Sequence, residues 1–187
     1  MRRAPVVLRT GDRSNARRLH ALITANLEEG HLLPRTFAEL VAHAERFTVA
    51  VKGRRIVGCA ELAPLSPSVA EVRSLAVDAS ARGAGVGRQI VEELRRRARR
   101  EGFEKLCAFT HAPGYFIQMG FSIVPHTWLL EKMFTDCLKC PHFRRCGQYG
   151  MVVPLDDAYE DREKAVNDGA DALTVSSASQ LHAPRYA

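Results

Sequence analysis

The chain has 187 residues and a formal net charge of +6, and 46% of its residues are hydrophobic and 26% charged. That length suits one domain of ordinary size. Since the sequence has no run of 18 apolar residues and its basic N-terminus lacks a signal-like apolar core, we expect no membrane partner and a cytoplasmic location.

The first half of the chain predicts a strand, two helices and a hairpin. Residues 5–9 form a short apolar strand, and residues 10–29 have the apolar spacing of a helix. Thr36 and Glu39 have the spacing of a capping box, which predicts that a second helix follows. Two apolar runs within 47–65, separated by Lys-Gly-Arg-Arg, predict a β-hairpin.

The second half of the chain predicts strands separated by helices. A third strand, a glycine-rich stretch and a helix follow one another over 70–100. The next strand is expected to run parallel to the third, because a helix separates them. Pro113 is placed like the first residue of a short helix. The remaining expected elements are the helix 113–119, the strands 104–112, 121–125 and 149–155, and an irregular loop at 126–147.

This order of elements predicts an α/β (α+β) domain. The sheet is expected to be mixed and mostly antiparallel, with one central parallel crossover and flanking helices. From residue 156 onward the sequence is polar, acidic and rich in alanine and serine. We therefore expect one domain over 1–155 and a flexible tail over 156–187. Because residues 155–187 carry a net −4, the remaining body carries +10, which suggests an anionic partner.

The stretch Arg82-Gly83-Ala84-Gly85-Val86-Gly87-Arg88 falls at the crossover, where α/β sheets tend to bind ligands. Its glycines expose backbone N–H groups, and the helix that begins there adds unpaired N–H groups and a positive dipole end. These features suit a pyrophosphate. The Lys-Ser or Lys-Thr of a Walker loop is absent. A structural turn without a ligand is the alternative.

Two segments resemble the GNAT acetyltransferase superfamily. VRSLAVDASARGAGVGRQIVEEL is similar to its acetyl-CoA-binding segment, and GYFIQMGF to its later helix ending in Gly-Phe. The resemblance implies acetyl-CoA as the cofactor, with its pyrophosphate on the backbone of 82–87. It implies that the main chain of Leu75, Ala76 and Val77 pairs with the pantetheine arm, in a splay between two strands. Arg82 and Arg88 could add charge for the phosphates. Superfamily members often dimerise, so a homodimer stays open.

A second resemblance lies outside the coenzyme segments. HLLPRTFAEL, GCAEL and EKMFTDCLKCPHFRRC are together similar to the short bacterial N-acetylglutamate synthases, with Phe134 where that group carries a tryptophan. The implied reaction moves the acetyl group of acetyl-CoA to the α-amino group of L-glutamate, the first step of arginine biosynthesis. Another small amine, amino acid or peptide N-terminus is the alternative acceptor.

The chemistry needs a proton acceptor, because only a neutral amine attacks a thioester. Glu71 opens the strand that the resemblance assigns to pantetheine binding, so it is the candidate base, acting directly or through a water. Alternatively, Glu71 pairs with a cation such as Arg73. Many superfamily members use a tyrosine as the acid where this chain has Phe116. Tyr115 beside it is expected to point elsewhere, so no acid is assigned.

The acceptor's carboxylates call for arginines, which bind carboxylates bidentately. Arg35 is the first candidate, because the resemblance places its segment over the acceptor, and Arg73 is the second. Thr110 and His111 end the strand beside the thioester and can hydrogen-bond an amino acid. Cys59 matches a family position near the acceptor, although a small buried strand residue is the simpler interpretation.

The odd number of cysteines, five, argues against a disulfide framework. Cys137, Cys140 and Cys146 lie in the expected loop, and with His126 they offer four zinc ligands. The loop is compact for such a site, so we expect no metal. Buried thiols or a redox-sensitive pair are the alternatives. A nucleic-acid module would interleave aromatic and basic residues, and the helix 88–100 has no aromatic residue, so we expect no nucleic-acid partner.

Overall fold

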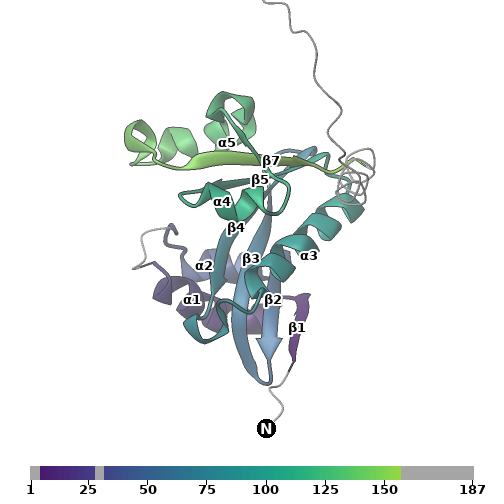
Figure 1. Cartoon of the computed structure of the whole chain (residues 1–187). Coiled ribbons are helices and arrows are strands. Elements are labelled where there is room, and N and C mark those ends of the chain that lie inside the picture. Colours follow the sequence, from purple (N-terminus) through teal and green to yellow (C-terminus); the bar gives the residue numbers. More distant parts are fainter. Residues whose placement is uncertain (1–4, 28–31, 157–187) are drawn as a thin grey trace, which may run out of the picture. The chain divides into compact units, whose positions relative to one another are not determined.

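The computed structural model describes residues 5–27 and 32–156. Within these ranges seven strands form one sheet in the order β1-β2-β3-β4-β5-β7-β6 (Figure 1). Only β4 and β5 pair in parallel among the described strands. The strands are β1 Val6–Thr10, β2 Phe47–Lys52, β3 Arg55–Pro64, β4 Val69–Val77, β5 Lys105–Thr110, β6 Ser122–Val124 and β7 Tyr149–Pro154. The mostly antiparallel sheet with one parallel crossover is confirmed. The expected tail falls outside the described residues, apart from Asp156.

Two of the helical segments in the first half of the chain begin at side-chain caps. Asp12 accepts a hydrogen bond from the Ser14 N–H at 2.8 Å and starts the 3-10 turn that leads into the first helix. Thr36 and Glu39 form the predicted capping box. The helices are α1 Ala16–Ala25, α2 Phe37–Ala42, α3 Val86–Arg100, α4 Pro113–Ile117 and α5 Leu130–Thr135. Among the described helices none is both long and apolar enough to cross a membrane.

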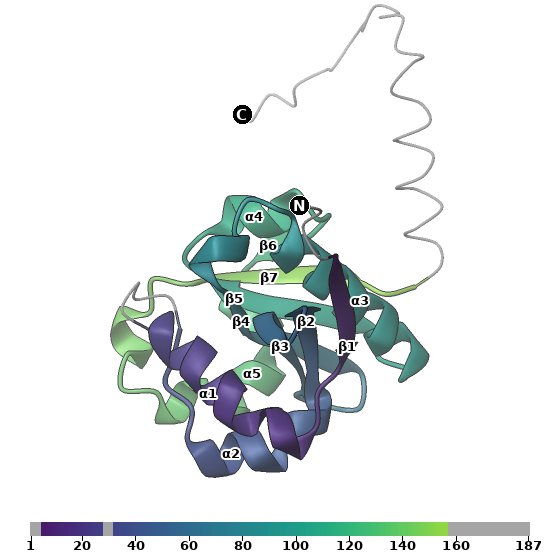
Figure 2. The same cartoon turned by 90° about the horizontal axis from the view of Figure 1, so that it is seen from below.

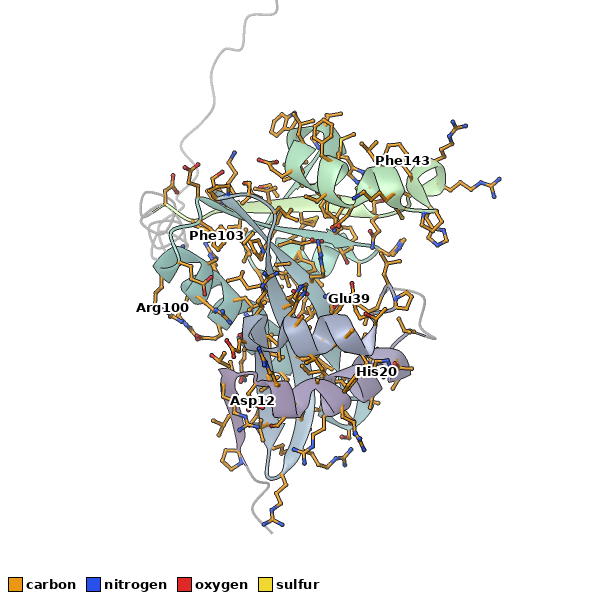
Figure 3. All side chains as sticks on the ribbon, turned by 180° about the vertical axis from the view of Figure 1, so that it is seen from behind. Asp12, His20, Glu39, Arg100, Phe103 and Phe143 are labelled. Carbon is orange, nitrogen blue, oxygen red and sulfur yellow. The ribbon has the colours of Figure 1, made fainter. Side chains whose placement is uncertain are left out.

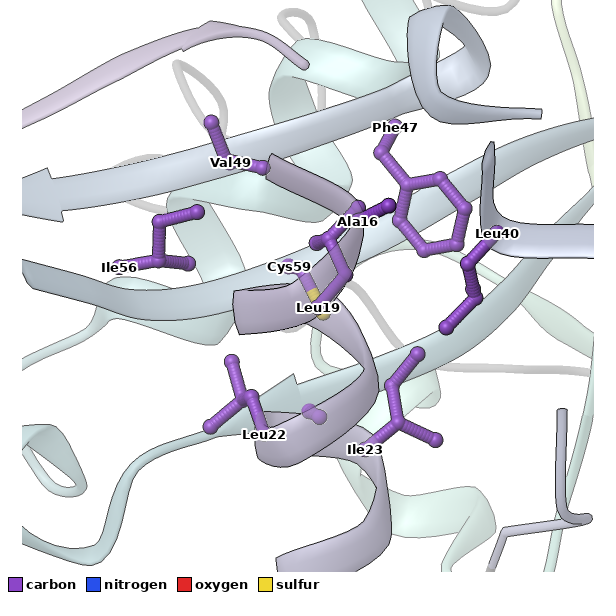
Figure 4. Close-up of a cluster of buried hydrophobic side chains, with 10 residues drawn as sticks. Ala16, Leu19, Leu22, Ile23, Leu40, Phe47, Val49, Ile56 and Cys59 are labelled. Atoms are coloured by element: carbon purple, nitrogen blue, oxygen red, sulfur yellow. The ribbon is translucent and has the colours of Figure 1, made fainter. Parts of the chain in front are cut away.

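Helices cover both faces of the sheet. α1 and α2 lie on one side of β2–β4 and α3 lies on the other, as the views in Figures 1 and 2 agree. On the α1 side, a buried cluster joins these helices to the strands (Figure 4). Its members are Ala16, Leu19, Leu22, Ile23, Leu40, Phe47, Val49, Ile56, Cys59 and Ala76. On the other side α3 packs closely, since a Cβ added at Gly58 would lie 2.8 Å from the Ile90 side chain.

β4 has two irregularities that open the middle of the sheet. Its pairing with β3 shifts between Cys59 and Glu61, and Ser74 adopts a positive φ of 54° at this bulge. Its parallel pairing with β5 ends at Val72, although β4 continues to Val77. The expected splay between the two strands is therefore present, and it leaves backbone groups of β4 available on that edge.

The segment 126–147 is more regular than expected. It contains 3-10 turns and the six-residue helix α5. Leu129, which is 1% exposed, packs beside Val69 and Cys107 and fixes the start of α5. Phe134 is 68% exposed. Because Trp128 and Leu130 are exposed as well, no buried stripe marks the helix in the sequence.

Candidate active site

The glycine-rich loop presents a run of unpaired backbone donors. Gly85 caps α3 without a side-chain hydrogen bond, in the left-handed conformation (φ +73°). From Gly83 to Gly87, no backbone N–H donates to another backbone group of the described chain, whereas the Gln89 N–H donates to the Gly85 carbonyl at 3.0 Å. The 15-residue α3 adds its positive dipole end at the same place. The loop is therefore built to bind an anion such as a phosphate.

The two arginines that flank the loop make intramolecular contacts. Arg82 donates from Nη2 to Asn26 Oδ1 at 2.7 Å and from Nε to the Val77 carbonyl at 3.1 Å. Arg88 donates from Nε to Glu92 at 2.8 Å. Arg82 therefore ties the loop to α1 and to the end of β4, which is a positioning role in addition to the predicted charge.

A cavity of about 380 Å³ lies where β4 and β5 separate. Figure 3 labels two of its lining residues, Glu39 from α2 and Phe143 from the turn after α5. Three of the predicted catalytic and acceptor-binding residues line it: Arg35, Glu71 and Arg73. The other lining residues include Leu32, Leu33, Pro34, Val72, Ser74, Phe109, His126, Lys132, Asp136, Cys137, Cys140, Cys146 and Gln148. The cavity thus combines one charged wall with an otherwise mostly apolar lining.

Glu71 is the centre of an ion network on this wall. Its carboxylate is buried and accepts from Lys132 Nζ at 2.8 and 2.9 Å and from Arg73 Nη2 at 2.6 Å. Asp136 accepts from the same two cations, from Lys132 at 2.8 Å and from Arg73. Burial by itself would raise the pKa of Asp136, but Lys132 and Arg73 outweigh it and lower that pKa. The alternative pairing of Glu71 with Arg73 is present in this structure, together with a second cation.

Arg35 is held by a second, deeper network. Its Nη1 donates to Glu61 at 2.7 Å and to the Ser74 hydroxyl at 3.2 Å. Glu61 is fully buried, and His43 Nδ1 lies 3.0 Å from its other oxygen. Glu61 also faces Arg73 across the β3–β4 ladder. The guanidinium of Arg35 is therefore fixed in place at the cavity wall.

The other predicted acceptor residues lie away from this cavity. Cys59 is 0% exposed beneath α1 (Figure 4), where its Sγ lies 3.8 Å from the Ser74 carbonyl and burial raises its pKa to about 12. The simpler interpretation of Cys59, a buried strand residue, fits this position. Thr110 Oγ1 accepts from the Ala112 N–H at 3.0 Å and shapes the turn into α4. His111 is exposed and lines a neighbouring cavity.

The zinc candidates share the cavity but do not form a metal site. Cys137, Cys140, Cys146 and His126 all line it. Within residues 5–27 and 32–156, no group of three or more potential ligands is arranged to hold a metal ion. His126 Nε2 instead lies 2.9 Å from the Gln148 carbonyl. Burial raises the pKa of the Cys137 thiol, so it stays protonated at neutral pH.

Comparison with known proteins decides the family. Residues 16–121 match the model of the acetyltransferase (GNAT) family, which is more than half of the chain. The chain belongs to this family. It is 30% identical over 146 residues to an uncharacterized N-acetyltransferase of Chlorobaculum tepidum, across 75% of this chain and 94% of that protein. It is 33% identical over 103 residues to an amino-acid acetyltransferase of Pseudomonas putida, but that match covers 54% of this chain and only 24% of the relative.

A solved structure supports the GNAT fold. N-acetylglutamate synthase of Neisseria gonorrhoeae, complexed with coenzyme A and N-acetyl-glutamate, superposes with a TM-score of 0.74. The match has 24% identity and covers 83% of this acetyltransferase and 36% of the synthase chain. At that identity the likeness establishes the fold alone. The coenzyme in that structure agrees with the predicted donor, and the unpaired N–H groups of the loop fit such a pyrophosphate.

Sequence reasoning missed three residues of this acetyltransferase's charged wall: Glu61, Ser74 and Asp136. Glu61 had a detectable signal, because it is the one charge within the apolar run from Ile56 to Ala63. A charge at such a position has to find a buried partner. Asp136 and Ser74 carry no comparable signal, since α5 and the bulge of β4 were not predicted.

Proposed function

We propose that this acetyltransferase moves the acetyl group of acetyl-CoA to the α-amino group of L-glutamate, as an N-acetylglutamate synthase in the first step of arginine biosynthesis. One observation carries the proposal: Arg73 and Lys132 share the carboxylate of Asp136 beside Glu71. Two cations placed to share one carboxylate can bind a substrate carboxylate in the same way. The names of the amino-acid acetyltransferase and synthase relatives support this acceptor class.

Arg35 is the proposed ligand of the second carboxylate. It lines the same cavity, and Glu61 and Ser74 hold its guanidinium. Fixing that side chain in advance removes much of the entropy loss that a flexible arginine would suffer on binding. Thr110 and His111, at the end of β5, stay proposed contacts of a larger part of the acceptor.

Glu71 is the proposed base. In the structure its lone pairs are directed at Lys132 and Arg73. When substrate carboxylates draw these cations away, Glu71 becomes free to accept a proton from the ammonium group, directly or through a water. The amine that results can attack the thioester carbonyl. A backbone N–H near Leu75 or Ala76, on the edge of β4 that β5 leaves unpaired, is the proposed donor to the oxygen that becomes negative.

The proposed acetyl-CoA site extends from the glycine-rich loop to the gap between β4 and β5. The N–H groups of 83–87 are proposed to hold the coenzyme pyrophosphate, since the Arg82 N–H, which was also predicted, donates to the Ala79 carbonyl at 3.4 Å. The main chain of Leu75, Ala76 and Val77 is proposed to bind the pantetheine arm. The thioester then lies where β4 and β5 separate, next to the charged wall. This placement puts both substrates at one opening of the sheet.

The test is thiol release from acetyl-CoA across a panel of L-amino acids. Glutamate is expected to react faster than aspartate, glutamine or methionine. Lys132→Met is expected to raise KM for glutamate and to leave KM for acetyl-CoA unchanged. The matched control, Lys105→Met at the exposed start of β5, should change neither value. Release with another amine and none with glutamate would establish the alternative acceptor class and overturn the glutamate proposal.

A further inference from the structure

The three glycines of the coenzyme loop answer two different physical needs. Gly83 and Gly85 both have φ +73°, and a Cβ added at either would meet no atom within 4 Å. Gly87 has an ordinary helical backbone, but a Cβ added there would lie 2.5 Å from Tyr115 Oη. Gly83 and Gly85 are therefore favoured by backbone conformation, whereas a side chain at Gly87 would have to displace the hydroxyl of a tyrosine.

Tyr115 thus reaches from α4 to the first turn of α3, away from the position of the general acid, as its place beside Phe116 suggested. A Cβ at Gly87 would also lie 3.5 Å from Val77 Cγ2, so the tyrosine hydroxyl stands next to the end of β4. Its ring packs edge-on against Phe116, with centroids 5.4 Å apart, and Phe116 packs in turn against Phe121. The side chain is therefore held by an aromatic stack, with its polar end over the loop.

The hydroxyl is suited to donate a hydrogen bond. Burial raises the pKa of Tyr115 above its ordinary value of 10.0, and the nearby charge of Arg88 opposes this only in part. The group therefore keeps its proton at neutral pH. Within the described part of the chain, no side chain or backbone group forms a hydrogen bond with this hydroxyl. The residue remains 37% exposed, so a ligand can reach it.

The direction of the Cα–Cβ bond places this donor beside the anion site. In an α-helix that bond tilts toward the N-terminus. Tyr115 Oη, which is near the position that a Cβ of Gly87 would occupy, thus lies toward the N-terminal end of α3, where the unpaired N–H groups point. We propose that the Tyr115 hydroxyl donates a hydrogen bond to a pyrophosphate oxygen of acetyl-CoA and completes the cradle formed by the loop backbone. This inference rests on the donor site proposed above and is independent of the acceptor.

Two other roles for Tyr115 make different predictions. A proton donor to the departing thiolate would have to reach the bulge of β4 at Ser74, whereas this hydroxyl lies at the opposite end of the splay, by Val77 and Gly87. A purely structural residue would need only its ring, which already packs on Phe116. Removing the hydroxyl and keeping the ring separates all three roles.

The experiment measures coenzyme A binding to Tyr115→Phe by calorimetry, without any acceptor. A hydrogen bond to a charged group contributes about 1.5–3 kcal/mol, so the affinity should fall roughly 10- to 100-fold. Pantetheine, which lacks the pyrophosphate, should bind the variant and the unsubstituted protein equally. Tyr149→Phe removes an exposed hydroxyl from β7 and serves as the matched control, with no change expected.

Three results would overturn the proposal. An unchanged affinity for coenzyme A would leave the tyrosine a packing residue. An equal loss for coenzyme A and pantetheine would move the contact to the pantetheine arm. Unchanged binding with a reduced kcat and a shifted alkaline limb of the pH profile would make the residue a proton donor. Because the binding assay contains no amine, the first two results are independent of whether glutamate is the acceptor, and the third is measured with whichever amine the thiol-release panel shows to react.

Discussion

At the scale of single residues, Glu61 is the side chain whose loss should cost most stability. It is 0% exposed and lies 2.7 Å from Arg35 and 3.0 Å from His43. Removing one partner of a buried pair leaves an uncompensated charge, so Glu61→Ala should lower the free energy of unfolding by about 3–5 kcal/mol. Glu101→Ala breaks the exposed pair with Arg97 and should lower it by only about 0–1 kcal/mol.

Urea denaturation of the two variants checks this contrast. Glu61→Ala should unfold at a clearly lower urea concentration than Glu101→Ala. Similar midpoints would mean that water reaches Glu61 in solution and that Arg35 is not fixed by it. In that case Arg35 would have to be ordered by the acceptor itself.

The proposed role of Glu71 as the base predicts the kinetics of a single-residue variant. Glu71→Gln keeps the shape of the side chain but cannot accept the proton of the amine. Acid–base catalysis contributes about 10²- to 10⁴-fold, so kcat should fall by that factor. Coenzyme A binding should stay unchanged, because the substituted carboxyl lies at the acceptor wall. A variant with normal kcat would show that another group, or water alone, removes the proton.

At the scale of elements, the contact between α3 and α4 predicts different effects of alanine at Gly87 and at Gly85. Gly87→Ala gains helix propensity, but its methyl group has to displace Tyr115 Oη. The substitution should therefore be more favourable in a Tyr115→Ala background than in the unsubstituted protein. Gly85→Ala should cost about 1–2 kcal/mol in both backgrounds, because it forces alanine into the left-handed region. Thermal or urea unfolding of the two glycine variants, each with and without Tyr115→Ala, measures the difference.

The elements that could be predicted from the sequence are those whose boundaries carry a short local motif. The capping box of Thr36, the Lys-Gly-Arg-Arg turn and the glycines before α3 each mark a boundary within a few residues of the chain. α5 escaped prediction because Phe134 and Leu138 are exposed, so no apolar stripe marks the face that it buries. The contact of Tyr115 with Gly87 was not predicted either, since it depends on how α4 packs against α3.

At the scale of the whole molecule, the coenzyme loop could be predicted and the acceptor wall could not. The loop is one continuous segment, so its motif contains the site. The wall is assembled from α2, β3, β4 and α5, and its ion pairs join residues as far apart as Arg73 and Asp136. Periodicity and spacing carry no information about such contacts. Arg35, Glu71, Arg73 and Lys132 were candidates from the sequence. Their partners Glu61 and Asp136 were identified only in the folded chain.

The charges of the whole molecule also give its response to acid. Five described carboxylates have lowered pKa values: Asp12, Glu39, Asp78, Glu93 and Asp136. For Asp12 the first cause is the hydrogen bond from the Ser14 hydroxyl, and for Glu39 it is the hydrogen bond from the Thr36 N–H. Each group binds its proton more weakly in the folded chain than in the unfolded chain, so together they stabilise the folded state at neutral pH.

That stabilisation is fully present above the ordinary values of 3.8 for aspartate and 4.5 for glutamate, and it is lost as the pH falls through the lowered values. The melting temperature should therefore be flat from pH 7 to about 5 and should fall steeply below about pH 4. Asp12→Asn keeps a good helix cap without a titrating group, so with Glu39→Gln it should make the acid limb shallower. Scanning calorimetry from pH 7 to 3 measures this slope. An identical slope in the double variant would mean that the two capping carboxylates contribute nothing to acid sensitivity.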